Sequence, residues 1–179
     1  MPLDQLSEFG YGAVTMDAVA QRAGVHKTTV YRRWSDRESL LQDAVLRVTV
    51  TPFTMPDTGD IDRDVAAAAQ ARAEWLTGPY GRQLIAMIGA GGAQSTGVQL
   101  AIARILSERG EGIQERLTKA ADDGQLPHDV DADVFLKTLL APLYFALLVT
   151  HEPLTPELVS LAARVSLTAA RNRQLSHGS

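Results

Sequence analysis

The chain of 179 residues contains no cysteine, so it forms neither disulfide bonds nor thiolate metal sites. Its four histidines are scattered, and no two of them stand at the spacing of a metal-binding pair. A glycine-rich phosphate loop is also missing, because the glycines between residues 89 and 97 follow no predicted strand and have no lysine beside them. Since no catalytic arrangement is evident, we predict that the protein is not an enzyme and uses no cofactor or metal.

Signals for export and membrane insertion are missing as well. The first ten residues carry two acidic residues and no basic residue, which argues against a secretory signal. The longest apolar run, around Leu139 to Val149, is shorter than a bilayer-spanning helix and contains Pro142. We therefore expect a cytoplasmic protein with no membrane contact. A hydrophobic content of 45% allows a sizeable core.

Basic residues are in the minority, since 17 lysines and arginines stand against 21 acidic residues and give a net charge of −4. Such a chain is not a general binder of polyanions. The charges are unevenly distributed, however, because residues 22–37 hold five basic residues and one acidic residue. The acidic excess lies beyond residue 47. This pattern favours one small positive surface on an otherwise acidic protein.

Residues 15–41 predict two short helices joined by a tight turn, with a third helix directly behind them. Thr15 can cap the first helix through its hydroxyl group. Met16 and Val19 then fall on one face at helical spacing. Gly24 supplies the turn, because glycine adopts positive φ without steric conflict.

The second and third helices follow from the next residues. Val30 and Trp34 are four residues apart and predict the buried stripe of the second helix. Ser35, followed three residues later by Glu38, has the spacing of a capping box. We therefore expect the third helix to open near Asp36 and to run to about Val48.

The outer face of the second helix is unusually polar. A solvated surface is the simpler explanation of a charge run alone. Here, however, basic, hydroxyl and aromatic side chains coincide with a helix-turn-helix frame, in which the second helix enters the major groove of DNA. We therefore predict that this surface binds double-stranded DNA. Its residues are His26, Lys27, Thr28, Thr29, Tyr31, Arg32 and Arg33, and Arg37 follows at the start of the next helix.

Several short motifs in the first 45 residues resemble the N-terminal domain of the tetracycline-repressor (TetR) family. They are Phe9-Gly10-Tyr11, Thr15-Met16, Val19-Ala20, Ala23-Gly24-Val25, Thr29-Val30-Tyr31 and Glu38-Ser39-Leu40-Leu41. The resemblance implies an all-helical, homodimeric transcription regulator. Such a protein is usually a repressor that a small-molecule effector releases from a palindromic DNA operator.

The resemblance also implies roles for individual residues. It places Lys27 and Thr28 near base edges, and it allows Arg32 to contact either bases or phosphates. It places five further residues near phosphates: Thr15, Thr29, Tyr31, Arg33 and Arg37.

The whole chain is predicted to be all-α. Residues 1–48 form the helix-turn-helix domain, whose short first helix carries Leu3, Leu6 and Phe9. Residues 49–60 hold two prolines and four threonines and predict a linker. Residues 61–179 then form a bundle for ligand binding and dimerisation. Its helices are expected over 61–77, 80–88, 98–121, 132–150 and 156–172.

An effector pocket is the hypothesis for the bundle, although apolar residues at helical spacing are more often plain core. The expected effector is mostly apolar or aromatic, because charged groups on these faces are few. Arg72 and His151 are possible polar anchors. The candidate lining residues are Trp75, Tyr80, Leu84, Met87, Ile88, Ile102, Ile105, Phe135, Leu139 and Tyr144.

The last two helices are expected to form a homodimer interface. The segment 132–150 is apolar nearly all round and needs cover that one short helix cannot supply. The helix from Asp36 to Val48 is the expected lever between effector and DNA. Two alternatives stay open: a DNA-binding dimer that answers to a protein partner or to no ligand, and an enzyme with an inherited helix-turn-helix. The predicted interface residues are Leu143, Leu147, Leu158, Leu161 and Val165.

Overall fold

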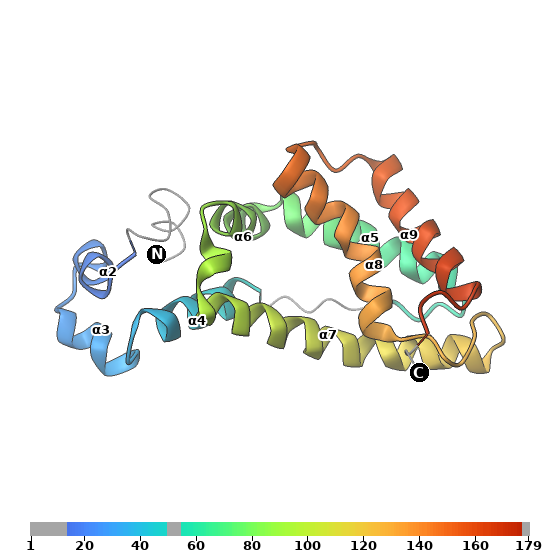
Figure 1. The fold of residues 1–179 in the computed structure, drawn as a ribbon, viewed down its shortest axis with the longest axis horizontal. Coiled ribbons are helices and arrows are strands. Elements are labelled where there is room, and N and C mark those ends of the chain that lie inside the picture. Colours follow the sequence, from blue (N-terminus) through green and yellow to red (C-terminus); the bar gives the residue numbers. More distant parts are fainter. Residues whose placement is uncertain (1–13, 50–54, 177–179) are drawn as a thin grey trace. The chain divides into compact units, whose positions relative to one another are not determined.

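The computed structural model describes residues 14–49 and 55–176, and Figure 1 shows that these residues are almost entirely helical. No β-strand occurs within them, and the one β-bridge joins Val130 to Ser176. The fold is therefore all-α, as predicted. The chain divides into two compact units, Met1–Thr51 with Gly78–Ile105 and Pro52–Thr77 with Leu106–Ser179. Residues 78–105 thus group with the helix-turn-helix region, a division that the sequence does not reveal.

The first unit contains the predicted pair of short helices, α2 (Met16–Ala23) and α3 (Lys27–Arg33). The Thr15 hydroxyl accepts a hydrogen bond from the Ala18 amide at 3.1 Å and caps α2, as predicted. Gly24 has a φ of 65°, so the turn uses the left-handed conformation that glycine allows. The predicted helix containing Leu3, Leu6 and Phe9 lies outside the described residues.

Helix α4 (Arg37–Val48) begins with a capping box, but the predicted residues are wrong. Asp36 is the cap: its carboxylate accepts from the Ser39 amide at 2.8 Å, and the Asp36 amide donates to the Ser39 hydroxyl at 3.3 Å. The aspartate is one residue closer to the helix than Ser35 and accepts more strongly because it is charged. The hydrogen bonds from Ser39 hold the pKa of Asp36 below its ordinary value. Glu38 is thereby released for another contact.

Glu38 binds the start of a distant helix. Helix α6 (Pro79–Gly89) is followed by a short 3₁₀ turn (Gly92–Gln94) and then by α7 (Thr96–Asp122). The Glu38 carboxylate accepts from the Ser95 hydroxyl at 2.5 Å and from the Gly97 amide at 2.9 Å. A negative charge at a helix N-terminus is stabilised by the unpaired amides and the helix dipole. This contact attaches α4 to the first turn of α7.

The second unit is built on α5 (Ile61–Thr77), α8 (Ala132–Phe145) and α9 (Pro156–Arg171), which pack together as Figure 1 shows. Helix α8 continues into a π-helical segment, Ala146–Thr150. The predicted ends of these helices agree with the observed ones to within a residue or two. Fully buried side chains of the unit include Ile61, Ile113, Leu117, Phe135, Leu136, Leu139 and Leu143.

One ion pair lies inside the core of the second unit. Asp64 is 0% exposed, and its carboxylate accepts from the Arg116 Nε at 2.8 Å and from the Thr58 hydroxyl at 2.6 Å. Burial alone raises the pKa of Asp64, but the hydrogen bonds from Thr58 and Arg116 outweigh burial and hold the pKa below its ordinary value. Arg116 also lies 3.5 Å from Asp57. This arginine is therefore neutralised from two sides.

The residues from Ala132 to Thr150 correct one prediction about membranes. They form a single helical stretch of 19 residues with a mean hydropathy of 1.7, which by length and composition alone is sufficient to cross a bilayer. The prediction from the shorter apolar run around Leu139 to Val149 was therefore wrong about length. Five side chains of α8 are nevertheless buried in the unit's own core, as in the core helix of a soluble protein: Phe135, Leu136, Leu139, Leu140 and Leu143.

Candidate functional site

Helix α3 presents nearly all of its side chains to solvent. Val30 is its one buried residue, at 3% exposure, and it fixes which side of the helix faces the protein. Because successive residues are 100° apart around a helix, Thr28 and Arg32 point most directly away from Val30. These two residues are four apart and form the crest of the exposed face.

The flanks of α3 carry the other predicted DNA contacts. Lys27 and Tyr31 stand four residues apart on one flank, while Thr29 and Arg33 occupy the other. Tyr31 is 50% exposed, and the Arg33 guanidinium lies 4.9 Å from the centre of the Trp34 ring. A helix in the major groove has a phosphate strand on either side. The exposed face of α3 thus has one crest, Thr28 and Arg32, and two flanks, and Lys27, which was predicted near base edges, lies on a flank.

Thr15 and Arg37 are the two predicted contacts that lie outside α3. Thr15 is exposed, although its hydroxyl group already accepts a hydrogen bond as the cap of α2. Arg37 is half-buried at the first position of α4, where its guanidinium lies 3.5 Å from the Glu38 carboxylate. The Trp34 indole donates to Asp43 at 3.1 Å and joins the C-terminal end of α3 to α4.

The ten residues proposed for an effector pocket are distributed over both units. In the first unit, Leu84, Met87 and Ile105 are buried, Ile88 and Ile102 are half-buried, and Tyr80 is 59% exposed. In the second unit, Phe135 and Leu139 are fully buried, whereas Trp75 and Tyr144 are half-buried. His151 is exposed in a left-handed turn conformation with a φ of 55°. Of the two suggested polar anchors, only Arg72 is buried.

Arg72 lies in a cluster of aromatic side chains within the second unit. It is 3% exposed, and its guanidinium carbon lies 4.3 Å from the centre of the Trp75 ring and 5.6 Å from that of Tyr144. One terminal nitrogen donates to the Tyr144 hydroxyl. The Arg72 Nε and the Trp75 Nε1 are buried without a hydrogen-bond partner in the described structure. Buried donors of this kind are rare and call for an explanation.

Arg109 is a functional candidate that sequence reasoning missed. It is 8% exposed on α7, and no described carboxylate forms an ion pair with it or with Arg72. Burial and, secondarily, the positive charge of Arg72 lower the pKa of Arg109 to about 10. The exposed Glu108 and the Tyr144 side chain act weakly in the opposite direction. The missed signal is spacing, because Arg109 interrupts the apolar stripe between Ile105 and Ile113.

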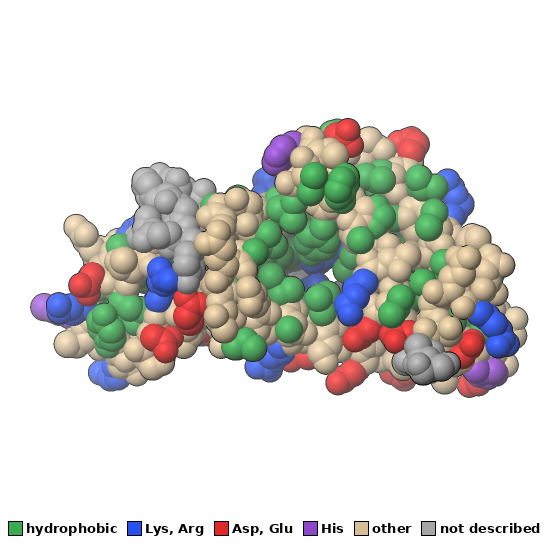
Figure 2. Space-filling model, in the orientation of Figure 1, with side chains coloured by type: hydrophobic (Ala, Val, Ile, Leu, Met, Phe, Trp, Pro, Cys, Tyr) green, Lys and Arg blue, Asp and Glu red, His purple; other side chains and the backbone are tan. Residues whose placement is uncertain are grey.

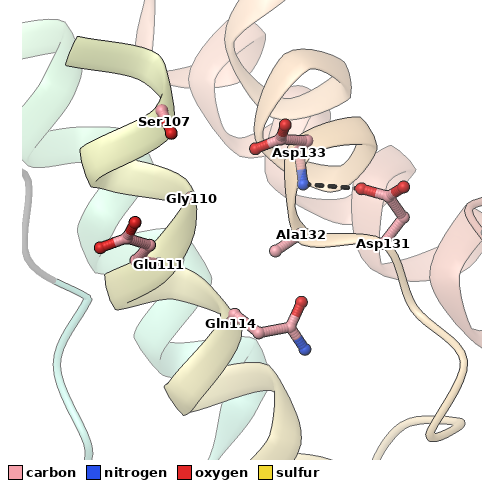
Figure 3. A pocket seen from close by; sticks show the side chains of 7 residues that line it. All are labelled: Ser107, Gly110, Glu111, Gln114, Asp131, Ala132 and Asp133. Atoms are coloured by element: carbon pink, nitrogen blue, oxygen red, sulfur yellow. Dashed lines mark hydrogen bonds between the residues drawn. The ribbon is translucent and has the colours of Figure 1, made fainter. Parts of the chain in front are cut away.

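A pocket of about 450 Å³ lies where α7 passes the first turn of α8 (Figure 3). Two of its acidic residues, Asp131 and Asp133, have contacts that stabilise the fold. The Asp131 carboxylate accepts from the Asp133 and Val134 amides at 2.9 and 3.1 Å and caps α8. A side chain at Gly110 would bring its Cβ to 2.5 Å from the Asp133 carboxylate, so glycine permits this close approach. No metal-binding cluster occurs among the described residues. We assign no ligand to this pocket.

Helices α8 and α9 expose an apolar surface. In Figure 2 hydrophobic side chains gather over these helices of the second unit. Among the predicted interface residues, Leu161 and Val165 are 47% and 50% exposed, and Leu147 and Leu158 are half-buried. Leu143 is 0% exposed and packs in the core of its own subunit, so it offers no surface to a partner. Further exposed members are Val134, Phe145 and Val149.

Comparison with known proteins gives a consistent result along the chain. Residues 3–44 match the family of bacterial regulatory proteins of the tetR type, and residues 55–165 match the tetracyclin repressor-like C-terminal domain. The HTH-type transcriptional regulator YdeS of Bacillus subtilis is 30% identical over 149 residues, covering 83% of this chain and 75% of the relative. The regulator AqdR of Rhodococcus erythropolis is 29% identical over 150 residues, with 83% and 72% coverage.

Solved structures agree with these relatives. The TetR family transcription regulator SCO0332 is 30% identical and superposes with a TM-score of 0.65 over 93% of this chain and 92% of its own. The flavonoid-responsive regulator FrrA is 16% identical and shares the fold with a TM-score of 0.70, over 96% and 92% of the two chains. Both the sequence matches and the fold therefore cover nearly the whole molecule.

Proposed function

Because the chain belongs to the TetR family of DNA-binding transcriptional regulators, we propose that it is a homodimeric repressor that a small-molecule effector releases from a palindromic operator. Members of the family are transcription regulators and not enzymes. We also propose that it acts in the cytoplasm, where its operator is accessible.

The polar face of α3 is the observation that carries the DNA-binding part of the proposal. Its crest, Thr28 and Arg32, can reach base edges, because the major groove exposes donor and acceptor patterns that distinguish all four base pairs. The flanking Tyr31 and Arg33 can bind phosphates, which position the helix without reading sequence. Lys27 begins the helix, where residues of a recognition helix contact bases.

The apolar surface of α8 and α9 supports the dimer. A single α3 reads only a few base pairs, whereas a two-fold pair of recognition helices reads two half-sites about one DNA turn apart. Exposed apolar residues such as Phe145, Leu161 and Val165 are concentrated on two adjacent helices. An isologous interface would cover them.

The contact between α4 and α7 supports a route for the effector signal. Glu38 joins α4 to the first turn of α7 through Ser95 and Gly97, and Arg109 belongs to the same helix. A ligand that binds one arrangement of α7 more tightly shifts the population of α4 positions. Full release of DNA requires about 5.5 kcal/mol of differential affinity, to which the two subunits of a dimer both contribute.

Operator footprinting tests the proposal. Purified protein should protect a palindrome next to its own gene, and a small molecule that raises its melting temperature should remove that protection. If no stabilising molecule altered the footprint, the effector part of the proposal would be wrong and the DNA-binding part would stand. Protection of a single half-site would contradict the dimer.

A further inference from the structure

Arg72 and Arg109, two buried arginines of the second unit, have no carboxylate partner among the described residues, whereas the buried Arg116 has two. Arg116 shares its charge with Asp64 and Asp57. Arg72 and Arg109 are just as buried, at 3% and 8% exposure, yet no described carboxylate pairs with either. A buried charge without a partner is strongly unfavourable, so folded proteins rarely retain one without a use for it.

The groups without partners around Arg72 are all hydrogen-bond donors. They are the Arg72 Nε and the Trp75 Nε1. Arg109 is buried on α7, near enough for the charge of Arg72 to act on it, and brings further donors and a second positive charge. The Arg72 guanidinium lies over the Trp75 ring and over the Tyr144 ring, and it donates to the Tyr144 hydroxyl. These three contacts fix the plane of the guanidinium. The donors are thereby held in position before any ligand arrives.

We propose that Arg72, Arg109 and Trp75 bind the anionic group of a small organic oxyanion, a carboxylate or a phosphate ester, beside an aromatic wall. Only an acceptor-rich anion satisfies unpartnered donors and two positive charges at once. The indole ring of Trp75 and the ring of Tyr144 give the apolar body of such a ligand a surface on which to pack. The identification of this anion as the effector rests on the proposed function, whereas its binding does not.

The two tryptophans of the chain provide a direct assay. Trp34 lies in the helix-turn-helix region and Trp75 in the proposed site. In a Trp34→Phe background the fluorescence reports on Trp75 alone. We would titrate this protein with benzoate, phenyl phosphate and benzyl alcohol, which share a ring and differ in charge. We expect saturable quenching or a spectral shift with at least one of the two anions and none with the alcohol.

Variants then test the arginines. Arg109→Met should weaken binding of the active anion by about 10- to 100-fold, as expected for loss of a charged hydrogen bond. It should also raise the melting temperature of the free protein, because an unneutralised buried charge is removed. Arg109→Lys keeps the charge without the planar fork and should bind with intermediate affinity. Arg164→Met, which removes an exposed arginine, is the matched control and should change neither quantity.

The possible outcomes distinguish a failure of anion binding from a failure of the proposed regulatory function. Equal binding of benzyl alcohol, no binding of either anion, or undiminished binding by both Arg109 variants would overturn the proposal. A preference for phenyl phosphate over benzoate identifies a phosphate ester, and the reverse identifies a carboxylate. Operator binding is measured in parallel on protein that retains Trp34: if the anion binds and DNA is retained, the oxyanion site stands and its role as effector fails. If DNA binds and no anion does, only the site is refuted.

Discussion

Asp64 forms the buried ion pair of the second unit with Arg116. Its replacement by asparagine leaves the buried Arg116 with the exposed Asp57 as its one charged partner among the described residues. We expect Asp64→Asn to lower the free energy of unfolding by about 3 to 5 kcal/mol at pH 7, measured by denaturant titration. Asp62→Asn, which breaks the exposed pair with Arg171, is the control and should cost less than about 1 kcal/mol.

The difference in unfolding free energy between wild type and Asp64→Asn should depend on pH, and the direction of that dependence follows from the pKa of Asp64. The folded-state pKa of Asp64 lies below its ordinary value of 3.8, so its contribution is complete above that value and is lost as pH falls through the folded-state pKa. The difference in unfolding free energy between wild type and Asp64→Asn should therefore narrow below about pH 4. A difference that widened on acidification would show instead that folding raises the pKa of Asp64.

The crest and flanks of α3 predict two kinds of DNA-binding defect. Arg33→Ala should weaken binding to every sequence and reduce the slope of log affinity against log salt by about one per subunit. Arg32→Ala should relax preference at particular base pairs, each worth about 1 to 3 kcal/mol. Binding to a set of operator variants at several salt concentrations distinguishes the two. Identical profiles would mean that position relative to Val30 does not assign these roles.

At the scale of elements, the junction of α4 and α7 depends on one glycine. A Cβ at Gly97 would overlap the backbone carbonyl of Glu38, so the two helices must separate to admit it. We expect Gly97→Ala to lower the free energy of unfolding by about 1 to 3 kcal/mol and to weaken operator binding. Gly112→Ala is the control in the same helix, because nothing lies within 4 Å of its Cβ.

The control has its own expected direction. Alanine at position 112 should stabilise α7 by roughly 1 kcal/mol, because glycine is a poor helix former in the interior. Thermal unfolding of both variants, followed by gel-shift titration, measures the contrast. Stabilisation by both alanines would mean that α4 is not held against the first turn of α7.

The helices themselves were predictable, because the spacing of apolar residues and the helix ends at Gly24 and Gly78-Pro79 are determined by residues close together in the sequence. The capping box was misassigned because Ser35 and Asp36 are both good caps, and the choice depends on which side chain reaches the Ser39 amide. The role of Glu38 was out of reach, since its partners lie 57 residues and more away. The burial of Arg109 was not predicted, because a charged residue on a helix is normally expected to face solvent.

At the scale of the whole molecule, the proposed dimer depends on the exposed faces of α8 and α9. We expect Leu161→Glu combined with Val165→Glu to yield folded monomers that lose operator binding, because a stable interface must bury about 1,000 Å² or more without unpaired charges. Sedimentation velocity at micromolar concentration and circular dichroism check assembly and folding. Leu143→Glu should instead unfold the subunit, since Leu143 is fully buried. A dimeric double variant would place the interface elsewhere.

The Glu38 contact also has an evolutionary consequence. A carboxylate at position 38, a hydroxyl at 95 and a glycine at 97 form one unit, since each loses its purpose when another changes. Among descendants of a common ancestor these three positions should change together and seldom singly. A lineage that has replaced the glycine should also have replaced the acid, and its α4 should meet the following helix through a different set of side chains. Drift in the DNA-reading face of α3 would remain free of this constraint, so operators could diverge while the junction stays fixed.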